Sequence, residues 1–165
     1  MNKINKGYVL VASIVLMFSM KSNAQISKAE IRATGLTCSM CSNAINKQLK
    51  SLPEVINVET DLNTNTFTVT LKEGNELSPK VFKEKVEKAG FFIGSLVITA
   101  KSETITKSPY ILVGKNSGTG SEVQFQVVDK GYVTDKEFKK VSKSYKDIAT
   151  YLVDNEDDFH IKILN

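Results

Sequence analysis

The 165-residue chain has only one arginine, Arg32, and one histidine, His160, and it has no tryptophan. Bidentate guanidinium contacts dominate the reading of nucleic acids by proteins, so this composition argues against a dedicated DNA- or RNA-binding protein. A single histidine also excludes a metal centre built from several histidines within one chain. The length allows one modest hydrophobic core or two small ones, which excludes a large multidomain enzyme.

The excess of positive charge belongs mostly to the N-terminus. The formal net charge is +4, from 22 Lys and Arg against 18 Asp and Glu. Three of the lysines, Lys3, Lys6 and Lys21, lie in the first 24 positions, and without them the net charge falls to about +1. The rest of the chain is therefore nearly neutral.

The first 24 residues have the pattern of a signal peptide. Lys3 and Lys6 precede 14 uncharged, mostly apolar residues at 7–20, fewer than the roughly 20 that a membrane span needs. Small residues at Ser22 and Ala24 then suit cleavage before Gln25. We expect residues 1–24 to direct export, which predicts a periplasmic or secreted protein with no membrane span after cleavage. The alternative is a retained N-terminal membrane anchor.

Residues 28–100 predict a complete α+β unit. Apolar residues alternate at 28–33, 56–62 and 66–71, as in β-strands, and the apolar run at 91–98 predicts a fourth strand. Helical spacing runs from Cys41 to Pro53, and again from Pro79, with Ser78 as its N-cap and Gly90 as its C-terminal cap. The predicted order is βαββαβ, the split βαβ arrangement of a ferredoxin-like sandwich.

A second, smaller α+β domain of unknown role is predicted at 108–165, after a polar linker at 101–107. Strands are expected at 110–113, 122–128 and 159–163, and Thr134 with Glu137 forms a capping box that begins a helix. The last strand carries His160, which we expect to be exposed or on an edge. The lysines of the helix form its solvated face or, as an alternative, a weak docking surface for an acidic partner; they are Lys136, Lys139, Lys140, Lys143 and Lys146.

The candidate functional residues are Cys38 and Cys41, on the loop between the first strand and the first helix. The second cysteine lies at or near the helix N-terminus, where the helix dipole favours a thiolate. Soft d10 metal ions prefer thiolates, and two on one short loop can bind Cu(I) in near-linear coordination. Such a site leaves the metal open to attack by a thiolate of a partner protein.

The segment Gly35-Leu-Thr-Cys-Ser-Met-Cys41 resembles the G-M-T-C-x-x-C motif of heavy-metal-associated domains, and the resemblance covers about residues 28–98. The family comprises ferredoxin-like modules of copper chaperones, copper-ATPase N-terminal domains and periplasmic mercury-binding proteins. The resemblance implies that Cys38 and Cys41 are the metal ligands, and that Phe91 or Phe92 lies near the metal loop. It says nothing about 108–165.

Two positions of the loop refine this expectation. Leu36 stands where the family usually has Met, and we expect it to serve as a similar apolar plug. Thr37 precedes the first cysteine, where zinc-selective members often carry a carboxylate, which favours Cu(I) over Zn(II). Hg(II) suits two thiolates equally and remains possible. Met40 is expected to point to solvent or to a partner.

The predicted function is binding of a heavy metal, with Cu(I) favoured, and its transfer to a metal-transporting or metal-accepting protein by ligand exchange. The protein is not expected to be an enzyme, because no substrate bond is broken and the single histidine is too far along the chain to make a nucleophile–base pair. The alternatives are a periplasmic Hg(II) scavenger, a thioredoxin-like redox pair, a resting disulfide, and an interaction or sensory module without metal.

Overall fold

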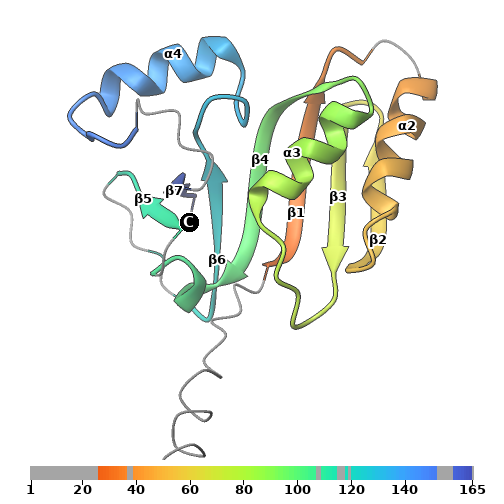
Figure 1. Cartoon of the computed structure of the whole chain (residues 1–165), viewed down its shortest axis with the longest axis horizontal. Helices are drawn as coiled ribbons and strands as arrows, with labels where there is room; N and C mark the ends of the chain where they lie inside the picture. Colours follow the sequence, from red (N-terminus) through yellow and green to blue (C-terminus); the bar gives the residue numbers. More distant parts are fainter. Residues whose placement is uncertain are drawn as a thin grey trace, which may run out of the picture.

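The computed structural model describes residues 26–36, 39–106, 109–114, 118, 120–151 and 158–164 (Figure 1). Within them lies one seven-stranded sheet of strand order β2-β3-β1-β4-β6-β7-β5. The strands are β1 (Ile26–Thr34), β2 (Val55–Asp61), β3 (Thr66–Leu71), β4 (Phe92–Lys101), β5 (Tyr110–Leu112), β6 (Glu122–Val127) and β7 (Phe159–Ile163). The helices are α2 (Ser39–Lys50), α3 (Pro79–Lys88), α4 (Asp135–Ser144) and the 3-10 turn η1 (Ser102–Thr104). The predicted signal peptide lies outside the described residues.

The first half of the chain has the predicted ferredoxin-like order of β1, α2, β2, β3, α3 and β4. Strand β1 lies between β3 and β4 and pairs antiparallel with both. Ile45 and Leu49 of α2 and Phe82 and Val86 of α3 are fully buried in one cluster with the sheet. Both helices therefore cover the same face of the sheet, and the predicted α+β fold is confirmed.

The two helices of this half begin and end for local reasons. Pro79 opens α3, and Gly90 follows it at a φ of 87°, the left-handed conformation that ends many helices. Helix α2 begins at Ser39, two residues earlier than the apolar periodicity indicated, because the sequence Ser-Met-Cys-Ser of its first turn has no periodic apolar pattern.

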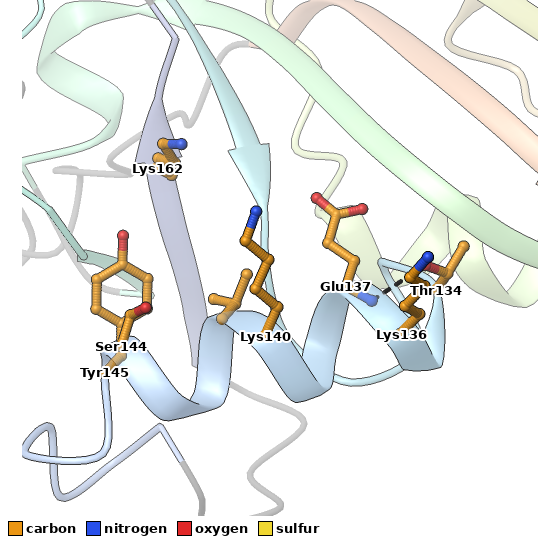
Figure 2. A pocket seen from close by; sticks show the side chains of 8 residues that line it. Thr134, Lys136, Glu137, Lys140, Ser144, Tyr145 and Lys162 are labelled. Carbon is orange, nitrogen blue, oxygen red and sulfur yellow. Dashed lines mark hydrogen bonds between the residues drawn. The ribbon is translucent and has the colours of Figure 1, made fainter.

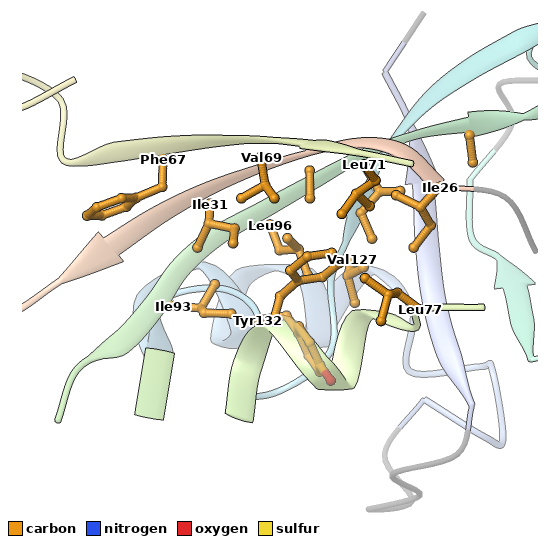
Figure 3. Close-up of a cluster of buried hydrophobic side chains, with 14 of the residues drawn as sticks. Ile26, Ile31, Phe67, Val69, Leu71, Leu77, Ile93, Leu96, Val127 and Tyr132 are labelled. Atoms are coloured by element: carbon orange, nitrogen blue, oxygen red, sulfur yellow. The ribbon is translucent and has the colours of Figure 1, made fainter. Parts of the chain in front are cut away.

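The second half of the chain extends the same sheet. Strand β6 pairs antiparallel with β4, β7 pairs antiparallel with β6, and β5 lies parallel to β7. Buried side chains of these strands belong to the main core, among them Phe125, Ile161 and Val127, the last of which is labelled in Figure 3. The 108–165 segment thus adds its strands to the first unit, and the described residues form no second sheet.

The stretch predicted as a linker at 101–107 is structured where it is described. Lys101 ends β4, η1 follows, and Thr104 is buried. The Ser102 backbone N–H donates to the Ser121 carbonyl at 3.0 Å. This short turn connects the end of β4 to the segment that leads to β5.

Helix α4 covers the opposite face of the sheet. Val127 points into the main core, whereas Val128 packs with Val113 and Tyr151 in a second cluster, because successive strand residues face opposite sides. Four partly buried residues pack on this second cluster: Phe138, Val141, Tyr145 and Ile148. The capping box is confirmed in part, since the Thr134 hydroxyl accepts from the Glu137 backbone N–H at 3.3 Å.

The expectation of an exposed histidine is wrong. His160 is 2% exposed, although it lies in β7 as predicted. Its Nδ1 lies 2.7 Å from Oδ1 of Asp129, its backbone N–H donates to Oδ2 at 2.7 Å, and its Nε2 lies 2.9 Å from the Thr150 hydroxyl. Because a carboxylate accepts hydrogen bonds, Nδ1–H of His160 donates to Asp129, and Nε2 is hydrogen-bonded to the Thr150 hydroxyl. Burial raises the pKa of Asp129, and the bonds from His160 oppose that rise.

We expect Asp129→Ala to lower the free energy of unfolding by about 2 kcal/mol, because it leaves the buried His160 backbone N–H and imidazole without their acceptor. Urea unfolding followed by circular dichroism measures the change. Asp147→Ala, at an exposed position, is the matched control and should change stability little. Equal effects of the two substitutions would contradict a structural role for the pair.

We expect Ile98→Ala to lower the free energy of unfolding by about 3 kcal/mol, because Ile98 is fully buried in β4 between β1 and β6. Ile98→Val, which removes one methylene, should cost about 1 kcal/mol. Hydrogen exchange should show the loss of protection in β1 and in β6 together. Protection lost in only one of these strands would contradict a single shared sheet.

We expect alkaline pH to destabilise the fold partly through Tyr110. Burial raises the pKa of the Tyr110 phenol above its usual 10.0, so the phenol stays neutral in the folded chain where the unfolded chain ionises it. Its stabilising contribution is therefore complete below about pH 10 and is lost as pH rises further. Urea midpoints from pH 8 to 11 should fall less in Tyr110→Phe than in the unsubstituted protein. Parallel curves would refute this assignment.

Candidate metal centre

The predicted metal loop joins the end of β1 to the start of α2. Cys41 is the third residue of α2 and is half-buried, in the first helical turn. Cys38 and Thr37 lie outside the described residues, so the structure places one of the two predicted ligands. Cys41 therefore lies near the helix N-terminus, as predicted.

Two side chains support the loop where it leaves β1. Leu36 is half-buried and packs on the main core, as expected for an apolar plug. Gly35 has a φ of +85°, a backbone conformation that other residues adopt rarely, and a Cβ there would lie 3.9 Å from the Phe91 ring. Phe91 packs on the main core beside Gly35, whereas Phe92 is 69% exposed. Of the two aromatic candidates, Phe91 is therefore the one in place beside the loop.

Exposed apolar side chains surround this end of the molecule. Met40, in the first turn of α2, is 81% exposed, as the sequence indicated. Phe92 begins β4 and is paired with Thr34, whose hydroxyl donates to the Phe92 carbonyl at 3.3 Å. Exposed apolar groups beside a candidate metal loop are suited to contact with a partner protein.

The C-terminal half also reaches this end, which sequence reasoning missed. Ser95 forms an isolated antiparallel bridge with Val133, just before α4. A Cβ added at Gly94 would lie 2.5 Å from the Thr34 methyl and 3.6 Å from the Thr134 methyl. The lack of a side chain at Gly94 thus lets the start of α4 approach the strand that leads into the loop. A lone glycine in the apolar strand run was the only available signal.

The only histidine makes side-chain hydrogen bonds that the sequence did not indicate. Thr150, His160 and Asp129 form a continuous chain of hydrogen bonds, although they are separated in sequence. The imidazole is buried and makes an edge-to-face contact with the Tyr151 ring. The two ring centroids are 5.0 Å apart, and the angle between the ring planes is 84°. We assign this chain of bonds to stability, because it satisfies both nitrogens of a histidine enclosed in the second cluster.

Two absences hold for the part of the chain that the structure describes. Within these ranges no group of three or more His, Cys, Asp or Glu side chains could hold a metal ion. Among the same residues, no helix has the length and apolar character needed to cross a membrane.

Comparison with known proteins places the loop in a family context. Residues 30–92 match the model of the heavy-metal-associated domain. A copper-transporting ATPase of Saccharomyces cerevisiae is 42% identical over 57 residues, which are 34% of this chain and 6% of that protein. The chain therefore spans only a small part of this curated relative.

Two solved structures are also similar to a part of this chain. The yeast copper transporter domain Ccc2a, solved in apo and Cu(I)-loaded states, is 38% identical, with 39% of this chain and 86% of that chain covered and a TM-score of 0.36. The N-terminal domain of a potential copper-translocating P-type ATPase from Bacillus subtilis, in the Cu(I)-loaded state, is 34% identical, with 41% and 82% covered and a TM-score of 0.36. The resemblance seen in the cysteine motif is thus confirmed by the family match, and residues 30–92 of this chain are a heavy-metal-associated domain.

Proposed function

We propose that the protein is an exported metal-binding protein that holds Cu(I) between the thiolates of Cys38 and Cys41 and passes it on by ligand exchange. The observation that carries this proposal is the position of Cys41 in the first turn of α2, three residues after Cys38, in a segment that matches the heavy-metal-associated domain. The yeast relative that shares this segment is named a copper-transporting ATPase, which favours copper as the cargo.

Metal capture follows from the chemistry of the two cysteines. Each thiol loses its proton on binding, so the two Cu–S bonds form as protons are released to solvent. Soft thiolates select Cu(I) over harder cations, and Thr37 adds no carboxylate to the loop that would favour Zn(II).

Transfer uses the open coordination of a metal held by two sulfurs. An incoming thiolate of the partner adds to give a three-coordinate ion, and one cysteine of this chain then leaves. The metal keeps its oxidation state and no substrate bond breaks, so the activity is binding and exchange and not an enzymatic reaction. Met40 and Phe92 are exposed beside the loop and would contact a metal-transporting or metal-accepting protein.

The N-terminal pattern of residues 1–24 supports export to a periplasmic or extracellular site, with a retained membrane anchor as the alternative. Export has a chemical consequence, because an oxidising compartment favours a disulfide between Cys38 and Cys41. A disulfide cannot bind Cu(I). The proposal therefore requires that copper protects the thiols or that a reductant acts in the same compartment.

We expect the reduced protein without residues 1–24 to bind one Cu(I) tightly in an anaerobic competition titration. Cys38→Ser and Cys41→Ser should each weaken Cu(I) binding by at least about 100-fold, since each removes one of two thiolate ligands. Met40→Ala is the matched control, because Met40 lies between the cysteines yet points into solvent. It should leave the Cu(I) affinity within about threefold.

Parallel titrations separate the alternatives. A higher affinity for Hg(II) than for Cu(I), measured in competition with small thiols, would favour a mercury scavenger. Binding that is indifferent to both cysteine substitutions would refute the metal site. A reduction potential in the range of disulfide oxidants, with turnover on a protein disulfide, would instead place the pair among redox motifs.

A further inference from the structure

A groove of about 430 Å³ lies between α4 and the face of the sheet that α4 covers (Figure 2). Its lining comes from α4, from the residue that caps α4, and from one residue of β7. The lining residues are Thr134, Lys136, Glu137, Lys140, Val141, Ser144, Tyr145 and Lys162. The volume falls in the range of about 300–1,000 Å³ that is typical of small-molecule sites.

The groove has a net positive lining of three lysines against one glutamate. In Figure 2 the side chains of Lys140 and Glu137 rise from α4 toward the sheet, and Lys162 lies on the strand across from them. The Glu137 carboxylate accepts a hydrogen bond from the Gln126 amide at 3.1 Å. No described acidic residue lies within ion-pair distance of Lys136, Lys140 or Lys162.

The placement of Lys140 and Lys162 has an electrostatic consequence. Two ammonium groups on opposite walls of one groove repel each other. An anion bound between them would be attracted to both groups and would offset this repulsion. The Tyr145 hydroxyl points toward Lys162 in Figure 2, and Ser144 supplies a second hydroxyl nearby. Hydroxyl and ammonium donors together match the oxygen atoms of a multivalent oxyanion.

Not every lysine of α4 faces this groove. Lys139 and Lys143 are exposed on the same helix and do not line it. All four of these helix lysines are exposed, and Lys136 and Lys140 differ from Lys139 and Lys143 in lining a groove that also contains Val141 and Tyr145.

We propose that this groove is a binding site for a small multivalent oxyanion, of the phosphate or polycarboxylate type, held between Lys140 and Lys162. The site is separate from the cysteine loop and does not depend on the copper proposal. Tyr145 and Ser144 donate hydrogen bonds to the bound anion, and Val141 contacts its less polar part. Phosphate and polycarboxylate share the same recognition chemistry and differ in size and geometry.

The test is a titration of the protein without residues 1–24, labelled with ¹⁵N, with inorganic phosphate and separately with citrate at constant ionic strength. We expect saturable amide shifts confined to residues 134–145 and 160–163 with at least one of the two anions. The anion with the lower dissociation constant identifies the preferred class. Lys140→Gln combined with Lys162→Gln should weaken binding at least tenfold.

The matched control is Lys139→Gln combined with Lys143→Gln, which removes the same amount of charge. Both of these lysines are exposed, and neither lines the groove. It should retain binding within about twofold. Linear shifts that do not saturate with either anion would overturn the proposal. Equal weakening by the two double variants would overturn it as well, because it would show a diffuse charge effect and not a site. Circular dichroism spectra confirm that both double variants are folded before they are compared.

Discussion

The antiparallel pairing of β4 with β1 on one side and with β6 on the other is the interaction on which the rest of the structure depends. Leu96, Ile98 and Ala100 are fully buried on one face of β4, and they contribute to the core that α2 and α3 close. The same strand offers its second edge to β6, so the C-terminal segment is built on the first unit. A chain of this length gains stability by enlarging one core instead of building two small ones.

This strand also organises the candidate metal centre. The start of β4 faces the end of β1, and the loop that carries the cysteines leaves from that point. Gly35 supplies the backbone turn and Phe91 packs beside it, whereas Gly94 leaves room for the start of α4. Both halves of the chain therefore meet beside Gly94 and Thr34, near the end of β1 from which the loop leaves, although the cysteine motif belongs only to the first half. The unassigned C-terminal segment, for its part, adds a basic helix and a groove on the opposite face of the sheet.

The first half of the fold could be predicted from the sequence because its signals are local. The strand alternation at 66–71, the Ser78–Pro79 helix start and the Gly90 cap are each written in a few adjacent residues. The single shared sheet could not be predicted in this way. The pairing of Ile98 with Phe125 depends on contacts between distant segments, and the polar residues between them look like a linker.

His160 shows the same limit for a single residue. Its alternating context placed it correctly in a strand, but its burial depends on Asp129 and Thr150, which approach only in the folded chain.

The candidate metal ligands, in contrast, could be identified from local sequence. Cys38 and Cys41 could be named from their spacing, from the predicted helix start and from the resemblance to a family motif, because all three are written in a few adjacent residues. Cys41 is found at the predicted helix start, and the pairing with Cys38 remains a prediction.

The most direct test of the account is X-ray absorption spectroscopy at the copper edge on the reduced, Cu(I)-loaded protein. The account predicts a copper ion with sulfur neighbours only, two in number, and loss of that signature in Cys38→Ser. Nitrogen or oxygen ligands in the first coordination shell, or an unchanged spectrum in Cys38→Ser, would contradict a site made by the two thiolates.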